Sequence, residues 1–501
     1  MGVNYRIPGG PLGCVLVMSL LLSSAGAAAE GVWSFTPRVT IGAEITDNAR
    51  FAPRGEERGD GIGVLEPGLS LSGEGARTSL DLDYAWDNRY RIRDTERDRS
   101  VHSLRGRGRY EVLADAVFIE GAIFRDIQAD SLLEPISSEN LEERTRYRLS
   151  PFWRARYGSL AEQELRYIYE ELRYHQSDRE GTQAHRGRYR LSSGSAFNRP
   201  DWSLMLSYDE NRYDRSASVE RYDAAFSGGY RLGRAVRLGG TVAQGRINSA
   251  DQEFDVDSWR AEFGWRPTRA TGIGASYGET RFGDADAREV RGLSVTHRTR
   301  RATLLLSYDE GVTDFGQTLD DDLLALLERR GQWTDAERRE LDRLLENIDP
   351  NLARILREID ELIVPEVAFT ETWRARWLYD TGRSTFALGL RQREIDDRFI
   401  FDSRPDERLE QERSVDGSWV WSLGPRTDLT ARLGVARTEV ARAQQPDTRL
   451  DEWRAGVGLN RELGSRATGR VEYQYRHNER SGAFDDERRE NRLLTRLRME
   501  F

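Results

Sequence analysis

A period-two alternation of apolar and polar residues constrains this chain more than any other feature. Trp259–Arg266, Trp373–Trp377, Trp453–Val457 and Val471–Arg476 each carry apolar or aromatic residues at every second position, separated by polar residues or glycine. Successive side chains of a β-strand point to opposite faces of the sheet, so each segment would have one apolar and one polar face. Such segments run for roughly 10–16 residues and recur along the chain, whereas a tilted strand needs about 9–11 residues to cross a bilayer. The pattern therefore predicts membrane-spanning β-strands.

The composition excludes three other classes of protein. Hydrophobic residues make up 38% of the 501 residues, which is low for a soluble chain that must bury several cores. The 12 Trp, 19 Tyr and 17 Phe are too many aromatic residues for a disordered chain. The only long charge-free apolar stretch is at the N-terminus, which excludes a helical membrane protein.

The N-terminus has the three parts of a secretory signal peptide. Arg6 is its only charge, the apolar run Leu12–Leu22 follows, and small residues fill Ser23–Ala29. We expect residues 1–29 to be a cleaved signal peptide and residues 30–501 to be the exported protein. Cys14, the only cysteine, would leave with the signal peptide, which excludes disulfides and thiol catalysis in the exported protein.

The spacing of the connections predicts the topology. Short turns such as Gly73–Gly75 and Gly424–Arg426 alternate with longer polar loops such as Asp47–Asp60, Asn248–Glu253 and Ile395–Leu409. Outer-membrane barrels have short periplasmic turns and longer extracellular loops in this order. The hairpin count predicts an all-β fold: a single transmembrane antiparallel up-and-down β-barrel of about 22 strands, with both termini periplasmic.

Apolar side chains at the boundaries of the predicted barrel indicate contact with the membrane and with the assembly machinery. Trp202 and Tyr208 stand near the ends of an apolar stripe, as interfacial girdle residues do. The last strand carries Leu497, Met499 and Phe501 on its apolar face, and this terminal stripe is expected to be the signal that the outer-membrane assembly machinery reads. The alternative is an ordinary edge strand that ends in phenylalanine.

Residues 319–365 break the period-two pattern and are predicted to be a helical insert in one extracellular loop. Acidic residues precede Leu323–Leu327, and Thr334 with Glu337 forms a capping box. Short amphipathic helices need a partner surface, so three roles are open: a cap over the loops, a gate folded into the mouth, or a docking surface for another protein. Because the alternation begins at Trp33, we expect no plug domain ahead of the barrel, and a lumen that is open or occluded by its own loops.

The polar faces of the predicted strands would line the lumen. The lumen-lining candidates are Arg260, Glu262, Arg266, Arg374, Arg376, Arg391, Arg432, Arg454, Arg470, Glu472 and Arg476. A dry core could not hold these charges, so this face is expected to be wet or cross-paired. Two roles are open: an arginine–carboxylate ladder that braces the wall, and a cationic lining that attracts an anionic polymer.

The sequence contains no complete catalytic or metal-binding motif. None of the five histidines stands at a metal-ligand spacing, and no nucleophile elbow or phosphate-binding loop is present. His477 follows two tyrosines on the lipid-facing register, which favours a girdle position over a catalytic one. We expect no catalytic residue, no cofactor and no metal. The expected partners are outer-membrane lipid and lipopolysaccharide, the assembly machinery and a polysaccharide, but not nucleic acid.

Several strand-and-turn segments carry a family resemblance. They are Pro37–Ile41 with Thr46–Ala49, Glu66–Arg77, Leu149–Ser159 with Glu164–Tyr167, and the helical insert before Pro365. These segments resemble the outer-membrane β-barrel family associated with the PEP-CTERM system. The resemblance spans the exported protein and implies a role in export or surface retention of an exopolysaccharide in a Gram-negative bacterium, without catalytic residues.

Taken together, the sequence predicts a non-enzymatic outer-membrane channel. One alternative is a non-conducting structural or assembly scaffold in the outer membrane. The other is a barrel hydrolase, which would require a serine or an acid beside His477 or His102.

Overall fold

The structure is a computed structural model that describes most of the expected barrel. The described residues are 32–129, 141–175, 181–214, 218–249, 252–283, 286–314, 367–396, 408–442, 446–482 and 485–501. The expected signal peptide, residues 1–29, and the expected helical insert, residues 319–365, lie outside these ranges. Within the described ranges, no helix is both long and apolar enough to cross a membrane.

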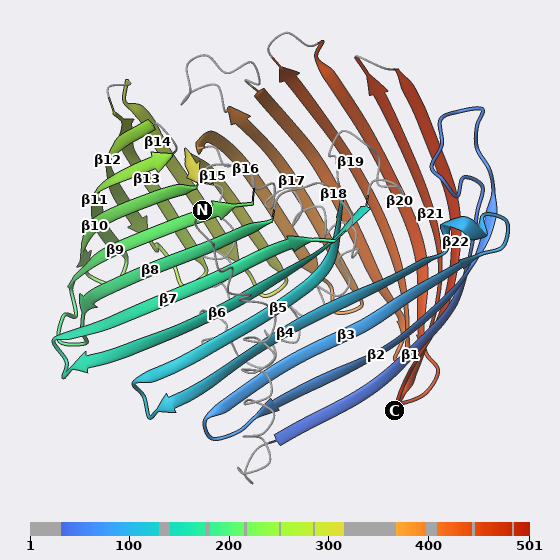
Figure 1. The fold of residues 1–501 in the computed structure, drawn as a ribbon, viewed down its shortest axis with the longest axis horizontal. Helices are drawn as coiled ribbons and strands as arrows, with labels where there is room; N and C mark the ends of the chain where they lie inside the picture. The colour runs from blue at the N-terminus through green and yellow to red at the C-terminus, as the bar shows by residue number, and fades with distance from the viewer. Residues whose placement is uncertain are drawn as a thin grey trace, which may run out of the picture.

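The described residues form one closed antiparallel β-barrel of 22 strands (Figure 1), which confirms the predicted fold class and strand number. Neighbours in sequence pair with each other, and β22 pairs with β1 to close the cylinder. The strands are β1 (Val32–Thr46), β2 (Asp60–Glu74), β3 (Thr78–Arg91), β4 (Arg99–Leu113), β5 (Val117–Ala129), β6 (Leu141–Tyr157), β7 (Ala161–Tyr174), β8 (Thr182–Ser193), β9 (Pro200–Tyr213), β10 (Val219–Leu232), β11 (Val236–Ser249), β12 (Gln252–Trp265), β13 (Thr271–Phe282), β14 (Arg288–Arg298), β15 (Ala302–Asp314), β16 (Val367–Asp380), β17 (Ser384–Asp396), β18 (Arg408–Gly424), β19 (Thr427–Arg442), β20 (Thr448–Glu462), β21 (Ala467–Ser481) and β22 (Asp486–Glu500). A short 3-10 helix, η1 (Thr95–Arg97), lies between β3 and β4.

The alternation in the sequence separates two faces of the barrel wall. On β12, Trp259 and Phe263 are exposed apolar side chains, and Arg260 lies between them on the opposite face. The polar face is the inner one, because polar side chains two strands apart meet on it. Arg166 of β7, for example, contacts Glu120 of β5 at 2.7 Å across the intervening β6. Such contacts require the concave side of a curved sheet, where side chains converge.

The two ends of the barrel differ in their connections. The turns at one end contain between two residues (425–426) and six residues (194–199), and the N-terminal end of β1 and the C-terminal end of β22 lie at this same short-turn end. Gly158, with φ 56°, and Gly382, with φ 89°, supply the left-handed backbone that such turns need. The expected long loop Asn248–Glu253 at the opposite end is wrong, because β11 and β12 continue their pairing through these polar residues up to 250–251.

Aromatic side chains flank the apolar outer face. Trp202 and Tyr208 on β9, and Trp373 and Tyr379 on β16, stand six residues apart on outward-facing positions. Six residues correspond to about 20 Å of extended strand. The indole nitrogen of Trp373 donates a hydrogen bond to Glu371 at 3.1 Å, so its polar edge points away from the apolar belt. This arrangement is typical of interfacial girdles in membrane barrels.

A buried carboxylate closes the barrel where the first and last strands meet. Glu44 of β1 has a side chain that is 0% exposed, and it faces Arg496 at 3.0 Å, Arg89 at 3.5 Å and Arg492 at 3.6 Å. These arginines come from β22 and β3, on either side of the β1–β2 hairpin. The network therefore links the first and last strands of the barrel on the inner face.

Candidate functional site: the charged inner wall

The structure places ten of the eleven expected lumen-lining residues on the polar inner face. They are Arg260, Glu262, Arg374, Arg376, Arg391, Arg432, Arg454, Arg470, Glu472 and Arg476, assigned by their strand register. Arg266 differs: β12 ends at Trp265, and Arg266 lies in the turn that follows, where its backbone N–H donates to the carbonyl of Ala235 at 2.6 Å. Extrapolating the alternation one residue too far placed it on the wall.

Some of these arginines brace the wall by pairing with carboxylates. Glu472 of β21 is buried and binds Arg470 of the same strand and Arg432 of β19, the latter at 3.5 Å. Glu452 of β20, which the sequence reasoning missed, binds Arg454 and Arg476, the latter at 3.1 Å. These pairs correspond to the ladder, one of the two roles left open by the sequence, and they link strands β19, β20 and β21 on the inner face.

Three of the expected arginines lack such a partner. Arg260 on β12 and Arg374 and Arg376 on β16 make no ion-pair contact or side-chain hydrogen bond with any residue in the described ranges. Arg376 does interact electrostatically with Asp416 of β18, which faces it across Gly389 of β17. In the register, Arg374 lies between Ser307 of β15 and Arg391 of β17, and no carboxylate stands opposite it on either side. Their guanidinium groups keep donors available to whatever occupies the lumen.

Small residues fill the inner face between these arginines. The positions concerned on β13, β14 and β15 are Gly274, Ser276, Gly278, Gly292, Ser294, Ser307 and Gly311. At Gly278 the wall has no room for more, because a Cβ there would lie 2.0 Å from the carbonyl oxygen of Trp259. The inner face from β13 to β15 is therefore lined mainly by small side chains, with the carboxylate Asp309 among them, and Arg260, Arg374 and Arg376 lie on the strands at its two sides.

A second concentration of arginine, on β4 to β8, was not among the predicted site residues. Arg105, Arg107 and Arg109 alternate along β4, and Arg186, Arg188 and Arg190 do so along β8, with similar alternation on β6. The signal was present in the sequence as Arg-x-Arg-x-Arg segments. The residues between these arginines include glycine and threonine, which weakens the apolar half of the pattern.

Two phenylalanines on the inner face organise the arginines at the short-turn end of this sector. Phe118 of β5 and Phe152 of β6 stack with ring centroids 4.8 Å apart, and both are buried. Arg109 lies 4.4 Å above the Phe118 ring, and Arg166 lies 4.0 Å above the Phe152 ring. Cation–π contacts of this kind hold a guanidinium flat on the ring and leave its edge free to donate hydrogen bonds.

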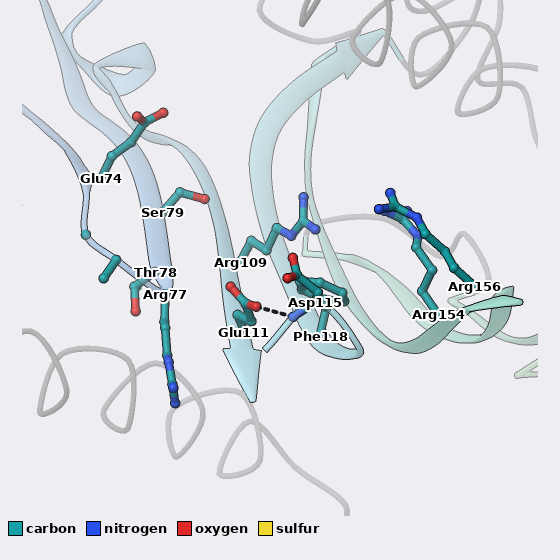
Figure 2. A pocket seen from close by; sticks show the side chains of 12 residues that line it. Glu74, Arg77, Thr78, Ser79, Arg109, Glu111, Asp115, Phe118, Arg154 and Arg156 are labelled. Atoms are coloured by element: carbon teal, nitrogen blue, oxygen red, sulfur yellow. Dashed lines mark hydrogen bonds between the residues drawn. The ribbon is translucent and has the colours of Figure 1, made fainter. Parts of the chain in front are cut away.

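A cavity of about 310 Å³ opens beside this stack, between the β2–β3 turn and the ends of β4 and β6 (Figure 2). Thr78 and Ser79 lie on one side, and Arg154 and Arg156 lie on the other, with Arg109 between them. Glu111 accepts a hydrogen bond from the backbone N–H of Asp115, which holds the β4–β5 turn. The lining thus combines guanidinium donors with hydroxyl and carboxylate acceptors.

The β1–β2 loop, residues 47–59, packs on the inner face near the opposite end. Phe51 is 3% exposed, and its ring lies 4.3 Å from the guanidinium carbon of Arg476. The side chain of Asn48 donates to the carbonyls of Ala52 and Arg489, both at 2.9 Å, which ties the loop to β22. Backbone N–H groups within the loop hold the pKa of Glu57 below its ordinary value.

The histidines are distributed over the outer face of the barrel. His102 stacks on Trp86 with ring centroids 5.6 Å apart, and His185 accepts or donates a hydrogen bond with the hydroxyl of Tyr167 at 2.7 Å. His477 lies on β21 beside outward-facing tyrosines, 4.0 Å from Glu487. No group of three or more potential metal ligands occurs within the described residues.

The expected assembly signal forms a row on the outer face of the last strand. Leu497 and Phe501 are exposed, and Met499 lies between them on the same face. The backbone N–H of Phe501 donates to the carbonyl of Pro37 at 2.9 Å, so the terminal residue continues the seam with β1.

Comparison with known proteins supports the fold. Neither a protein-family model nor a functionally described protein matches this sequence. Among solved structures, the siderophore receptor PirA from Acinetobacter baumannii is similar with a TM-score of 0.52 and 8% identity, over 93% of this chain and 80% of that one. The FrpB iron transporter from Neisseria meningitidis is similar with a TM-score of 0.52 and 8% identity, over 96% of this chain and 83% of that one. This chain therefore has the fold of an outer-membrane β-barrel.

Proposed function

We propose that this protein is a non-enzymatic channel in the outer membrane, exported by a cleaved signal peptide, that passes an anionic polysaccharide. The exopolysaccharide assignment rests on the PEP-CTERM resemblance, and the channel assignment rests on the chemistry of the inner wall. The membrane location is supported by the barrel fold and by the exposed apolar face between aromatic girdles.

The observation that carries the proposal is the set of arginines without ion-pair partners in the described part of the chain. Arg260, Arg374 and Arg376 face the lumen beside strands whose inner faces carry mainly glycine, serine and threonine, with Asp309 among them. A cationic wall bounded by a low-dielectric barrel attracts anions and raises their local concentration. Small side chains leave space in front of the same groups, so a polymer could pass them without losing contact with the guanidinium donors.

The experiment is conductance in a planar bilayer under a salt gradient. We expect the full chain to conduct and to prefer anions. The double substitution Arg374→Gln and Arg376→Gln should shift the reversal potential toward cation preference. Arg413→Gln is the matched control, because Arg413 is an exposed residue that faces outward on the nearby β18. An unchanged reversal potential in the double variant would contradict the role of these arginines.

A second readout addresses the polysaccharide itself. Deleting the gene should reduce the polysaccharide on the cell surface, and the wild-type chain should restore it better than the double variant. Normal surface polysaccharide in the deletion strain would refute the exopolysaccharide role. A silent bilayer together with a polysaccharide defect would instead favour the scaffold alternative, in which the barrel retains matrix components without conducting.

A further inference from the structure

The geometry points to a binding site for a carboxylate-bearing sugar unit in the cavity at the short-turn end of the barrel. This inference rests on the proposed function for the saccharide part, and it names the substrate class: a polysaccharide that contains uronic-acid units. Its position at the short-turn end, which is the periplasmic end in outer-membrane barrels, would make it the first contact for a polymer that leaves the periplasm.

The cationic side of the cavity keeps spare hydrogen-bond donors. Arg109 is stacked on Phe118, and its nearest carboxylate, Glu120, is 4.0 Å away, beyond hydrogen-bond distance. Arg156 contacts Glu162 at 3.3 Å, but the Arg156 side chain is 66% exposed. A guanidinium has five N–H donors, so a single weak contact leaves most of them available. Both groups can therefore take up a carboxylate through paired N–H donors.

The ring of Phe118 fixes the position of this donor set. Arg109 and Arg154 lie over the same ring, at 4.4 and 6.0 Å from its centroid. Arg154 is also held by Glu164 at 2.9 Å. Arg109 and Arg154 are thus placed before any ligand arrives, which lowers the entropy cost of binding.

The other side of the cavity suits hydroxyl groups. On the side of the β2–β3 turn Ser79 presents a hydroxyl and Glu74 a carboxylate, and Asp115 adds a carboxylate beside Arg109 (Figure 2). Sugar hydroxyls donate to carboxylates and exchange hydrogen bonds with hydroxyls. The same carboxylates repel a ligand that carries negative charge over its whole surface, such as a polyphosphate. A sugar ring with one carboxylate satisfies both sides, and a cavity of about 310 Å³ is of the size that holds a small ligand.

The test is isothermal titration of the full chain in detergent with a trimer of galacturonic acid, beside neutral maltotriose and the non-sugar acid succinate. We expect the acidic trimer to bind and the other two to bind much more weakly. Arg156→Gln should weaken binding of the acidic trimer by roughly tenfold or more, the usual effect of losing a charge-assisted hydrogen bond. Arg109→Gln should do the same.

Arg105→Gln is the matched control, because Arg105 is an exposed inner-face residue of β4, the same strand as Arg109, and does not line the cavity. Its affinity for the acidic trimer should equal that of the wild type. Equal affinity for maltotriose, equal affinity for succinate, or unchanged affinity in Arg156→Gln would each overturn the inference. A channel that conducts but does not bind the trimer refutes this site alone, and a silent barrel that binds it refutes the channel alone.

Discussion

Glu44 offers the sharpest test of how the barrel is closed. The substitution Glu44→Gln keeps the shape of a side chain that is 0% exposed and removes its charge. Arg89, Arg492 and Arg496 would then lose the one carboxylate that all three share, while Arg89 keeps Asp87 at 3.0 Å and Arg492 keeps Glu490 at 2.7 Å. Removing one partner of a buried ion pair costs about 3–5 kcal/mol, because the remaining charge stays buried.

The structure places the expected loss at the lower end of that range. The three arginine side chains are 25%, 26% and 32% exposed, so water can solvate them in part. We therefore expect Glu44→Gln to lower the free energy of unfolding by about 3 kcal/mol. The measurement is equilibrium unfolding by guanidinium chloride of the barrel folded into lipid vesicles, followed by tryptophan fluorescence.

Glu262→Gln is the matched control. Glu262 is also an inner-face glutamate, but its side chain is 42% exposed and its ion pair with Arg237 spans 3.4 Å. An exposed pair of this kind contributes at most about 1 kcal/mol. If Glu44→Gln destabilised the barrel no more than Glu262→Gln does, the reasoning that the buried network closes the barrel would be wrong.

Three further outcomes follow from the same structure. Val435 lies near the middle of the outer face of β19, so Val435→Arg should lower the free energy of unfolding in vesicles by about 2–4 kcal/mol. Ala436→Arg, at the next residue and on the inner face, should cost much less. Equal losses in vesicle unfolding would contradict the assignment of faces. Phe51→Ala should increase hydrogen exchange in residues 47–59 and leave the barrel strands protected, because the ring contacts Arg476 rather than the wall as a whole. Hydrogen-exchange mass spectrometry is the measurement, and unchanged exchange in the loop with lost protection in the strands would contradict the prediction. Phe501→Ala should lower the amount of barrel assembled in the outer membrane of cells while refolding into detergent proceeds at the wild-type yield; normal assembly would refute the terminal signal.

The sequence alone was sufficient for the architecture. Lipid outside and polar groups inside impose opposite requirements on neighbouring residues, so strands such as Trp259–Trp265 reveal their faces without any knowledge of tertiary contacts. The same requirement makes the strand number countable, because each passage through the membrane repeats the pattern. The misplaced ends, at Arg266 and at Asn248–Glu253, lie where strands leave the apolar belt and the requirement no longer applies.

The inner wall could be predicted only as a list of charges. Alternation shows that Arg374 and Arg432 share a face, but it does not show that Arg432 has a carboxylate within reach and that Arg374 has none in the described ranges. Those pairings depend on register and on contacts between strands two apart, such as β19 with β21. They connect residues that are distant in sequence, and local patterns carry no information about them.

The division between sequence and structure has one physical cause. Solvent preference acts on each residue separately, so the sequence by itself determined that this chain forms a barrel with a membrane-facing exterior. The buried carboxylate at the seam, the stacked Phe118 and Phe152 with their arginines, and the cavity beside them depend on distances between separate strands. Only the closed barrel brings those groups together, so only the tertiary structure decided where a ligand could bind.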